Sequence, residues 1–117
     1  DTPGEGGEDQ MSFTEHQEAK PVHMFPGVVR RTMTDGELMM LCEVSMERGS
    51  VVPRHTHPHE QTGWLASGRL RLEVAGESRD LEPGDAWMIP GGVPHAAEAL
   101  ETSVFVDVFS PPREEYR

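Results

Sequence analysis

Apolar side chains recur at every second position along much of this chain, and no helical repeat persists for more than about one turn. The segment ELMMLCEVSM (37–46) shows the alternation most clearly. Its apolar set is Leu38, Met40, Cys42, Val44 and Met46. This pattern predicts a strand with one buried face, on which Cys42 is a core thiol rather than a reactive one.

Further segments extend the same pattern. RLRLEV (69–74) is expected to place Leu70, Leu72 and Val74 inward, and Gly68 is expected to turn the chain between it and GWLAS. AWMIP and SVFVDVF predict two more strands, and the turn-forming segments LEPGD and PGGVP flank AWMIP. Many short strands without helices predict an all-β fold, an antiparallel sandwich or barrel.

Composition narrows the function classes. A chain of 117 residues predicts one domain, and a formal net charge of −11 argues against a nucleic-acid partner. No segment has the length and apolarity of a membrane span, no signal peptide is evident, and lone Cys42 cannot form an internal disulfide. A cytoplasmic protein is therefore expected. Residues 1–10 are expected to be a disordered tail or a cloning remnant, with Met11 as a candidate start and 11–117 as the folded domain.

Three of the six histidines lie within RHTHPHEQ (54–61). His55 and His57 are two positions apart, so an extended segment places both on one face. His95 follows a Pro/Gly turn and is expected to begin another strand, which precedes the SVFVDVF strand. Three imidazoles with the amide oxygen of Gln61 would leave coordination positions open, as in a catalytic metal site. The alternative to a metal site is that His55 and His57 are simply two histidines on a surface strand, where such a pair can occur by chance.

Two longer segments carry a resemblance. GSVVPRHTHPHEQTGWLASG resembles the first cupin motif, and GDAWMIPGGVPH resembles the second. The resemblance implies a double-stranded β-helix, a jelly-roll barrel, with one divalent metal ion held inside by His55, His57 and His95. Gln61 stands where cupins usually have a glutamate ligand; Glu60 is an alternative ligand, but it points to the opposite side of an extended chain. The ligand types do not distinguish Ni, Zn, Fe and Mn.

The replacement of glutamate by Gln61 has an electrostatic consequence. Neutral imidazole and amide ligands leave the charge of a divalent ion uncompensated, which favours an anionic substrate. In SVFVDVF, Asp107 lies between Phe105 and Phe109 on an otherwise apolar face. It is expected at an exposed edge, paired with an arginine for stability, or inside the barrel, where desolvation would raise its pKa as a proton-transfer group needs. On the residues alone, Arg113 is a solvated tail residue.

A narrower resemblance changes that expectation. HTHPHEQTGW together with DVFSPPREEY is similar to the small cupins of pectin and alginate breakdown, which linearise 4,5-unsaturated uronates to 4-deoxy-5-keto-uronates. It implies an enzyme acting on a small anionic sugar. Its implied metal ligands are His55, His57, Gln61 and His95, and its implied catalytic residues are Asp107, Phe109 and Arg113. Trp64 stands where this family often has a tyrosine, which predicts an altered pocket wall.

Two other function classes remain open. A metal-dependent dioxygenase would need redox-active iron, copper or nickel, so activity with zinc would separate it from a uronate-opening enzyme. A non-catalytic cupin would bind a sugar acid without converting it. The apolar outer faces of the strands predict a homodimer.

Overall fold

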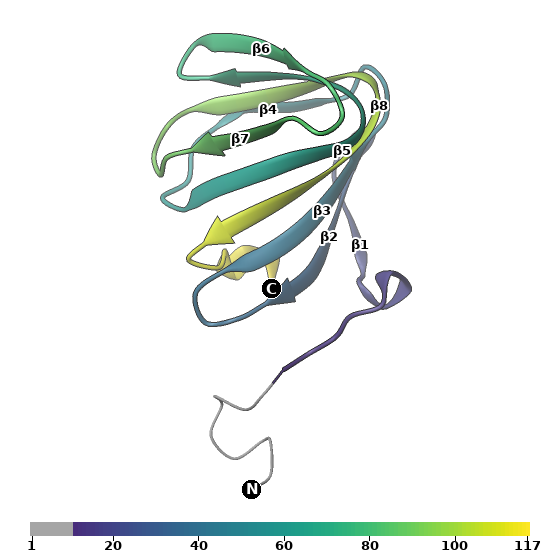
Figure 1. The fold of residues 1–117 in the computed structure, drawn as a ribbon, viewed down its shortest axis with the longest axis vertical. Helices are drawn as coiled ribbons and strands as arrows, with labels where there is room; N and C mark the ends of the chain where they lie inside the picture. The colour runs from purple at the N-terminus through teal and green to yellow at the C-terminus, as the bar shows by residue number, and fades with distance from the viewer. Residues whose placement is uncertain (1–10) are drawn as a thin grey trace, which may run out of the picture.

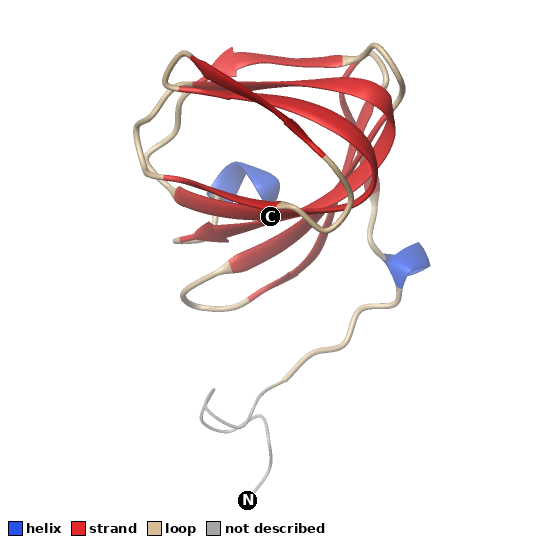
Figure 2. Cartoon of the chain, turned by 45° about the horizontal axis from the view of Figure 1, so that its top comes forward, coloured by secondary structure: helices blue, strands red, loops and turns tan. Residues whose placement is uncertain are grey.

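The computed structural model describes residues 11–117, so the expected tail at 1–10 lies outside the described residues. Eight antiparallel strands curl into a barrel that is open at one end (Figures 1 and 2). They are β1 (Pro21–Phe25), β2 (Val28–Asp35), β3 (Met40–Met46), β4 (Val51–His55), β5 (Glu60–Val74), β6 (Glu77–Leu81), β7 (Ala86–Ile89) and β8 (His95–Ser110). The helices among these residues are the short 3₁₀ helices η1 (His16–Glu18) and η2 (Glu114–Tyr116).

The two longest strands, β5 and β8, organise the barrel. They pair with each other along most of their length. The C-terminal half of β8 also pairs with β3, and its N-terminal half pairs with β4. In the same way, β5 pairs first with β7 and then with β6. Each long strand therefore passes through both layers, β1-β2-β3-β8-β5-β7 and β4-β8-β5-β6, and the predicted jelly-roll fold is confirmed.

Gly68 bends β5 instead of ending it. The strand continues from Glu60 to Val74, so the expected turn between two strands is wrong. Gly68 has a φ of 93° at a point where the register with β8 shifts, and a Cβ there would collide with Ser103. The Ser103 hydroxyl accepts a 3.0 Å hydrogen bond from the backbone N–H of Arg69. A glycine that permits a positive φ and close backbone approach thus lets one strand serve both layers.

The alternation predicted for β3 is confirmed from Met40 onward. Its inward residues Met40, Cys42, Val44 and Met46 are buried. Leu38, by contrast, precedes the strand and is 68% exposed, so its predicted burial is wrong. On β5, Leu70 and Leu72 are buried as predicted, and Val74 is half-buried.

The face of β8 that carries Asp107 points into the barrel. Phe105, Asp107 and Phe109 are buried, whereas the valines between them are half-buried. His95 lies at the start of this same strand, so its expected place on a preceding strand is wrong. The bend of β8 through both layers is what brings the two ends of one strand to a common pocket.

Candidate active site

Three histidines converge inside the barrel. His55 is the last residue of β4, and its backbone pairs with that of His95 at the start of β8. His57 follows in the loop after β4. One ring nitrogen of each histidine lies within 4.8 Å of the other two. The residues that sequence spacing selected are therefore brought together, in an arrangement compatible with a metal ion.

Backbone carbonyls fix how each imidazole is protonated. The Nδ1 atoms lie near carbonyl oxygens at 2.9 Å for His55, 3.1 Å for His57 and 2.9 Å for His95. A carbonyl can only accept, so Nδ1–H donates in each ring and the Nε2 lone pair remains free. Burial lowers the pKa of His57 to about 4, and it also lowers the pKa of His95. Neutral imidazoles with free lone pairs are the form that ligates metals.

Two further atoms in the cluster fit a cation. Oε1 of Gln61 lies 2.9 Å from Nε2 of His57. Because the His57 proton is on Nδ1, where it is donated to the carbonyl of His59, Nε2 has no proton and two acceptor atoms face each other. Among the described residues, the buried Nε2 of His95 has no hydrogen-bond partner. Rotating the Gln61 amide would relieve the first conflict but not the second. A cation bound by these atoms relieves both.

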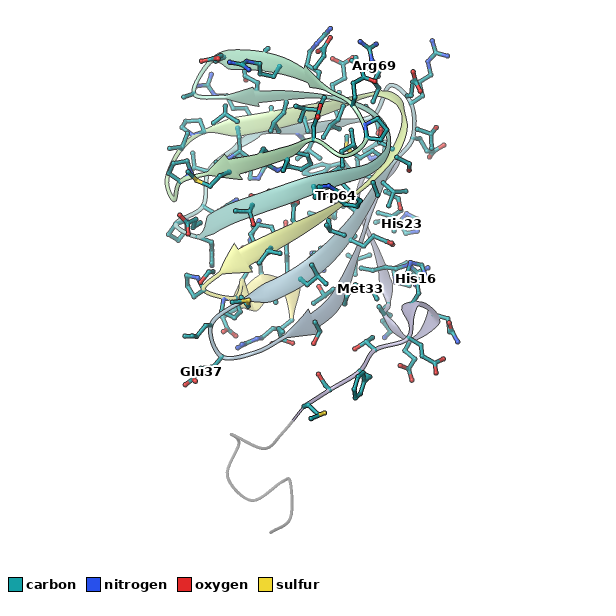
Figure 3. All side chains as sticks on the ribbon, in the orientation of Figure 1. His16, His23, Met33, Glu37, Trp64 and Arg69 are labelled. Carbon is teal, nitrogen blue, oxygen red and sulfur yellow. The ribbon has the colours of Figure 1, made fainter. Side chains whose placement is uncertain are left out.

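The neighbouring polar residues lie differently. Gln61 is buried and its neighbour Glu60 is exposed, as the alternation along β5 requires. The His59 ring lies 5.6 Å from that of His57, but His59 is not part of the three-histidine cluster. His16 begins η1 and His23 lies on β1; both are exposed at the outer edge of the barrel (Figure 3).

Asp107 lines the pocket that also contains His55, His95 and Gln61. Its side chain is 5% exposed, and its Oδ1 atom has no hydrogen-bond partner among the described residues. Burial raises the pKa of Asp107 to about 7, against the opposing influence of the nearby Gln61, Arg113 and Trp87. A carboxyl group with this pKa can both give and accept a proton near neutral pH.

Arg113 is buried in the pocket wall and is not the solvated tail residue that its sequence context indicates. Its Nε and Nη2 atoms donate to Oε2 of Glu115, at 3.3 and 3.0 Å. Its guanidinium carbon lies 5.1 Å from the ring centre of Phe109, and the Phe109 ring meets His57 edge-on at 5.6 Å between ring centres. Phe109 therefore separates Arg113 from the histidine cluster with an apolar surface.

Among the pocket residues that were not anticipated from the sequence, Arg30, Trp87 and Tyr116 have polar or aromatic side chains. Alternation along β7 could have predicted that Trp87 points inward, since it shares a face with Ile89. On β2, by contrast, Arg30 and Arg31 are adjacent, so alternation does not show which of the two points inward. The predicted role of Trp64 in the pocket wall is wrong. Trp64 lies on the outer face of β5 (labelled in Figure 3), is 48% exposed and does not line the pocket.

Comparison with known proteins agrees with this architecture. Residues 42–109 match the cupin domain family, which covers more than half of the chain. The chain belongs to the cupin family. This cupin is 36% identical over 93 residues to the pectin degradation protein KdgF of Dickeya dadantii, which covers 77% of this chain and 84% of that protein. It is thus a homologue of KdgF.

Solved structures give the same result for the fold. The structure of KdgF from Halomonas sp. has a TM-score of 0.87 and 34% identity, covering 92% of this cupin and all of that chain (100%). An RmlC-like cupin from Shewanella frigidimarina has a TM-score of 0.86 at 23% identity, covering 92% and 97% of the two chains, and supports the fold alone. Within residues 11–117, no helix is long and apolar enough to cross a membrane.

Proposed function

We propose that this cupin converts 4,5-unsaturated uronates into linear 4-deoxy-5-keto-uronates. The observation that carries the proposal is the pocket, in which a buried carboxyl group, Asp107, lies with two members of the three-histidine cluster, His55 and His95. The relationship to a pectin degradation protein supports a sugar acid as the substrate.

We assign the metal site to His55, His57, Gln61 and His95, with His59 and Glu60 outside it. A divalent ion bound there would supply Lewis acidity toward a carboxylate and an adjacent oxygen of the substrate. None of these four side chains carries a negative charge in the neutral-histidine form. The site therefore retains positive charge and favours an anionic ligand over a neutral one.

The reaction is an isomerisation, so no atom is gained or lost. The C1–O5 bond of the ring breaks, the C1 hydroxyl loses its proton, and the C1 carbonyl and the C5 enolate form. The enolate then becomes the C5 ketone as C4 gains a proton, so that one proton is lost and one is gained. Asp107 is suited to accept the proton from the C1 hydroxyl and to deliver one to C4, because its buried carboxyl group has an unpaired oxygen facing the pocket.

The remaining proposed residues position the substrate. Arg113 orients the anionic end with the guanidinium donors that Glu115 does not use. Phe109 packs against the sugar ring and excludes water from the reacting atoms, since it is buried between Arg113 and His57.

The test is loss of ultraviolet absorbance from 4,5-unsaturated galacturonate, whose conjugated double bond disappears as the ketone forms. The metal-loaded protein should accelerate this loss, and the same protein treated with a chelator should not. Acceleration with zinc would exclude a dioxygenase, which needs a redox-active metal. Binding of the uronate without turnover would leave a sugar-acid-binding cupin and contradict the proposed reaction.

We also propose that residues 11–117 act as one domain in the cytoplasm and form a homodimer. Met88 is 55% exposed and Trp64 is 48% exposed. The strand register places Trp64 opposite Val106, and places Met88 and Val108 on either side of Thr62, on the outer face of β5, β7 and β8. Exposed apolar groups gathered on one sheet face favour association. Light scattering should give the mass of a dimer for the parent and of a monomer for Trp64→Glu; equal masses would contradict this interface.

A further inference from the structure

Arg30 is a buried cation in the proposed substrate pocket. It lies on β2 in register with Val44 of β3, which in turn pairs with Phe105 of β8. All three residues are buried and line the pocket. Only 8% of the Arg30 surface is exposed, so a permanent positive charge stands against an apolar wall.

The surroundings of Arg30 leave its charge without a counter-ion. Among residues 11–117, the ion pairs involve His16 and other arginines, and no carboxylate lies within ion-pair distance of Arg30. Its Nε–H is buried and has no hydrogen-bond partner. The guanidinium carbon lies 3.8 Å from the ring centre of Tyr116, and this stacked position still leaves the buried Nε–H without an acceptor.

Arg113 offers a direct comparison within the same pocket. Its guanidinium also stacks on Tyr116, at 4.0 Å from the ring centre, but two of its N–H groups are already donated to Glu115. Arg30 has no such acceptor. A buried guanidinium without a carboxylate costs folding free energy, so its position is best explained by an anion that is present when the protein works.

We propose that Arg30 is a substrate-binding residue that donates hydrogen bonds to the carboxylate of the sugar acid, with Arg113 as the second guanidinium of the anion site. The inference rests on the proposed function for the identity of the sugar acid. Tyr116 contacts both guanidinium groups and therefore sets their spacing. A planar carboxylate is the class of ligand that a guanidinium binds with paired hydrogen bonds.

The test compares Arg30→Met with Arg31→Met. Both variants remove one positive charge from β2, but Arg31 donates to the backbone carbonyls of His16 and Ala19 outside the pocket. On the metal-loaded protein, Arg30→Met should raise KM for 4,5-unsaturated galacturonate at least about tenfold with kcat nearly unchanged, as loss of uniform binding does. Calorimetry with saturated galacturonate, which is not converted, should show the same loss of affinity. Arg31→Met should change neither value.

The melting temperature separates binding from a structural role. Arg30→Met should melt at or above the parental temperature without ligand, because methionine suits the apolar wall and removes an unpaired buried charge. A lower melting temperature together with unchanged affinity for galacturonate would overturn the inference. If Arg30→Met does not fold, Arg30→Lys is measured instead, since it retains the charge; an unchanged KM and affinity for it would likewise overturn the inference.

The two proposals can fail separately. Turnover by the parent with an unaltered KM in Arg30→Met would reject the role of Arg30 and retain the reaction. Galacturonate binding that is lost in Arg30→Met, without turnover by the parent, would reject the reaction and retain the anion site. A parent that neither converts the unsaturated uronate nor binds galacturonate would overturn both.

Discussion

Replacing Asp107 with asparagine tests the centre of the proposed mechanism. Asparagine has nearly the same size and cannot transfer the proton. General acid–base groups typically contribute about 10²–10⁴-fold, so turnover of the unsaturated uronate should fall within that range. Metal content should stay unchanged, because Asp107 is not among the proposed ligands. Absorbance assays and metal analysis on the same preparation check both outcomes.

The burial of Asp107 also allows a prediction for stability. Its pKa is raised from 3.8 to about 7, a difference of about three units that corresponds to about 4 kcal/mol. The sign follows from proton binding. Between these pKa values the unfolded carboxyl group is ionised while the folded one is protonated, so the free energy of unfolding falls by about 1.4 kcal/mol per pH unit. The full stability contribution of the protonated group is present below pH 3.8 and is lost above pH 7.

Asparagine has no such pH dependence. In metal-free protein, the free energy of unfolding of Asp107→Asn minus that of the parent should therefore increase as the pH rises from about 4 to 7. Above pH 7 this difference should become constant. His57 and His95 act in the opposite direction, because their lowered pKa values make the fold more stable as the pH rises from the folded toward the unfolded pKa. Both histidines are present in each protein, so their contribution cancels in the difference.

Urea unfolding of both proteins in the presence of a chelator, at pH values from about 4.5 to 8, measures this difference. A difference that does not change with pH would refute the argument that burial controls the Asp107 carboxyl group. Near-normal turnover by Asp107→Asn would separately refute its role in proton transfer. A purely structural aspartate predicts that second result together with a lowered melting temperature.

Four further variants test other parts of the site. His57→Ala should lose the metal while His59→Ala retains it, and the barrel should remain folded in both because strand burial holds it together; full metal content in His57→Ala would contradict the ligand assignment. Gln61→Glu should retain the metal but weaken affinity for anionic substrates, and turnover equal to that of the parent would reject the argument from uncompensated charge. Gly63→Ala should lower the melting temperature by several degrees, because the added Cβ would collide with the indole of Trp87; an unchanged value would show that the indole moves aside.

The sequence by itself determined the fold class and the residues of the histidine cluster. Period-two alternation over 40–46 identifies a strand and its buried face, since one face is apolar and the other is not. The two-residue spacing of His55 and His57 is enough to bring their rings together at the end of β4, and the motif around His95 placed it beside them. These are local features, or features of a recurring motif, so they can be predicted from short segments without knowledge of how the rest of the chain folds.

Tertiary structure decided the rest, because it depends on contacts between distant segments. Both faces of SVFVDVF are apolar apart from one acid, so alternation could not show that Asp107 faces inward. Gly68 is compatible with a turn or a bend, and only pairing with β8 selects the bend. Arg113 is buried because the C-terminal segment folds back over β2, where the Thr32 hydroxyl donates to the carbonyl of Tyr116 at 2.6 Å. The same return of the chain places Tyr116 against Arg30, and the physical reason is that a barrel closes by joining residues that are far apart in sequence.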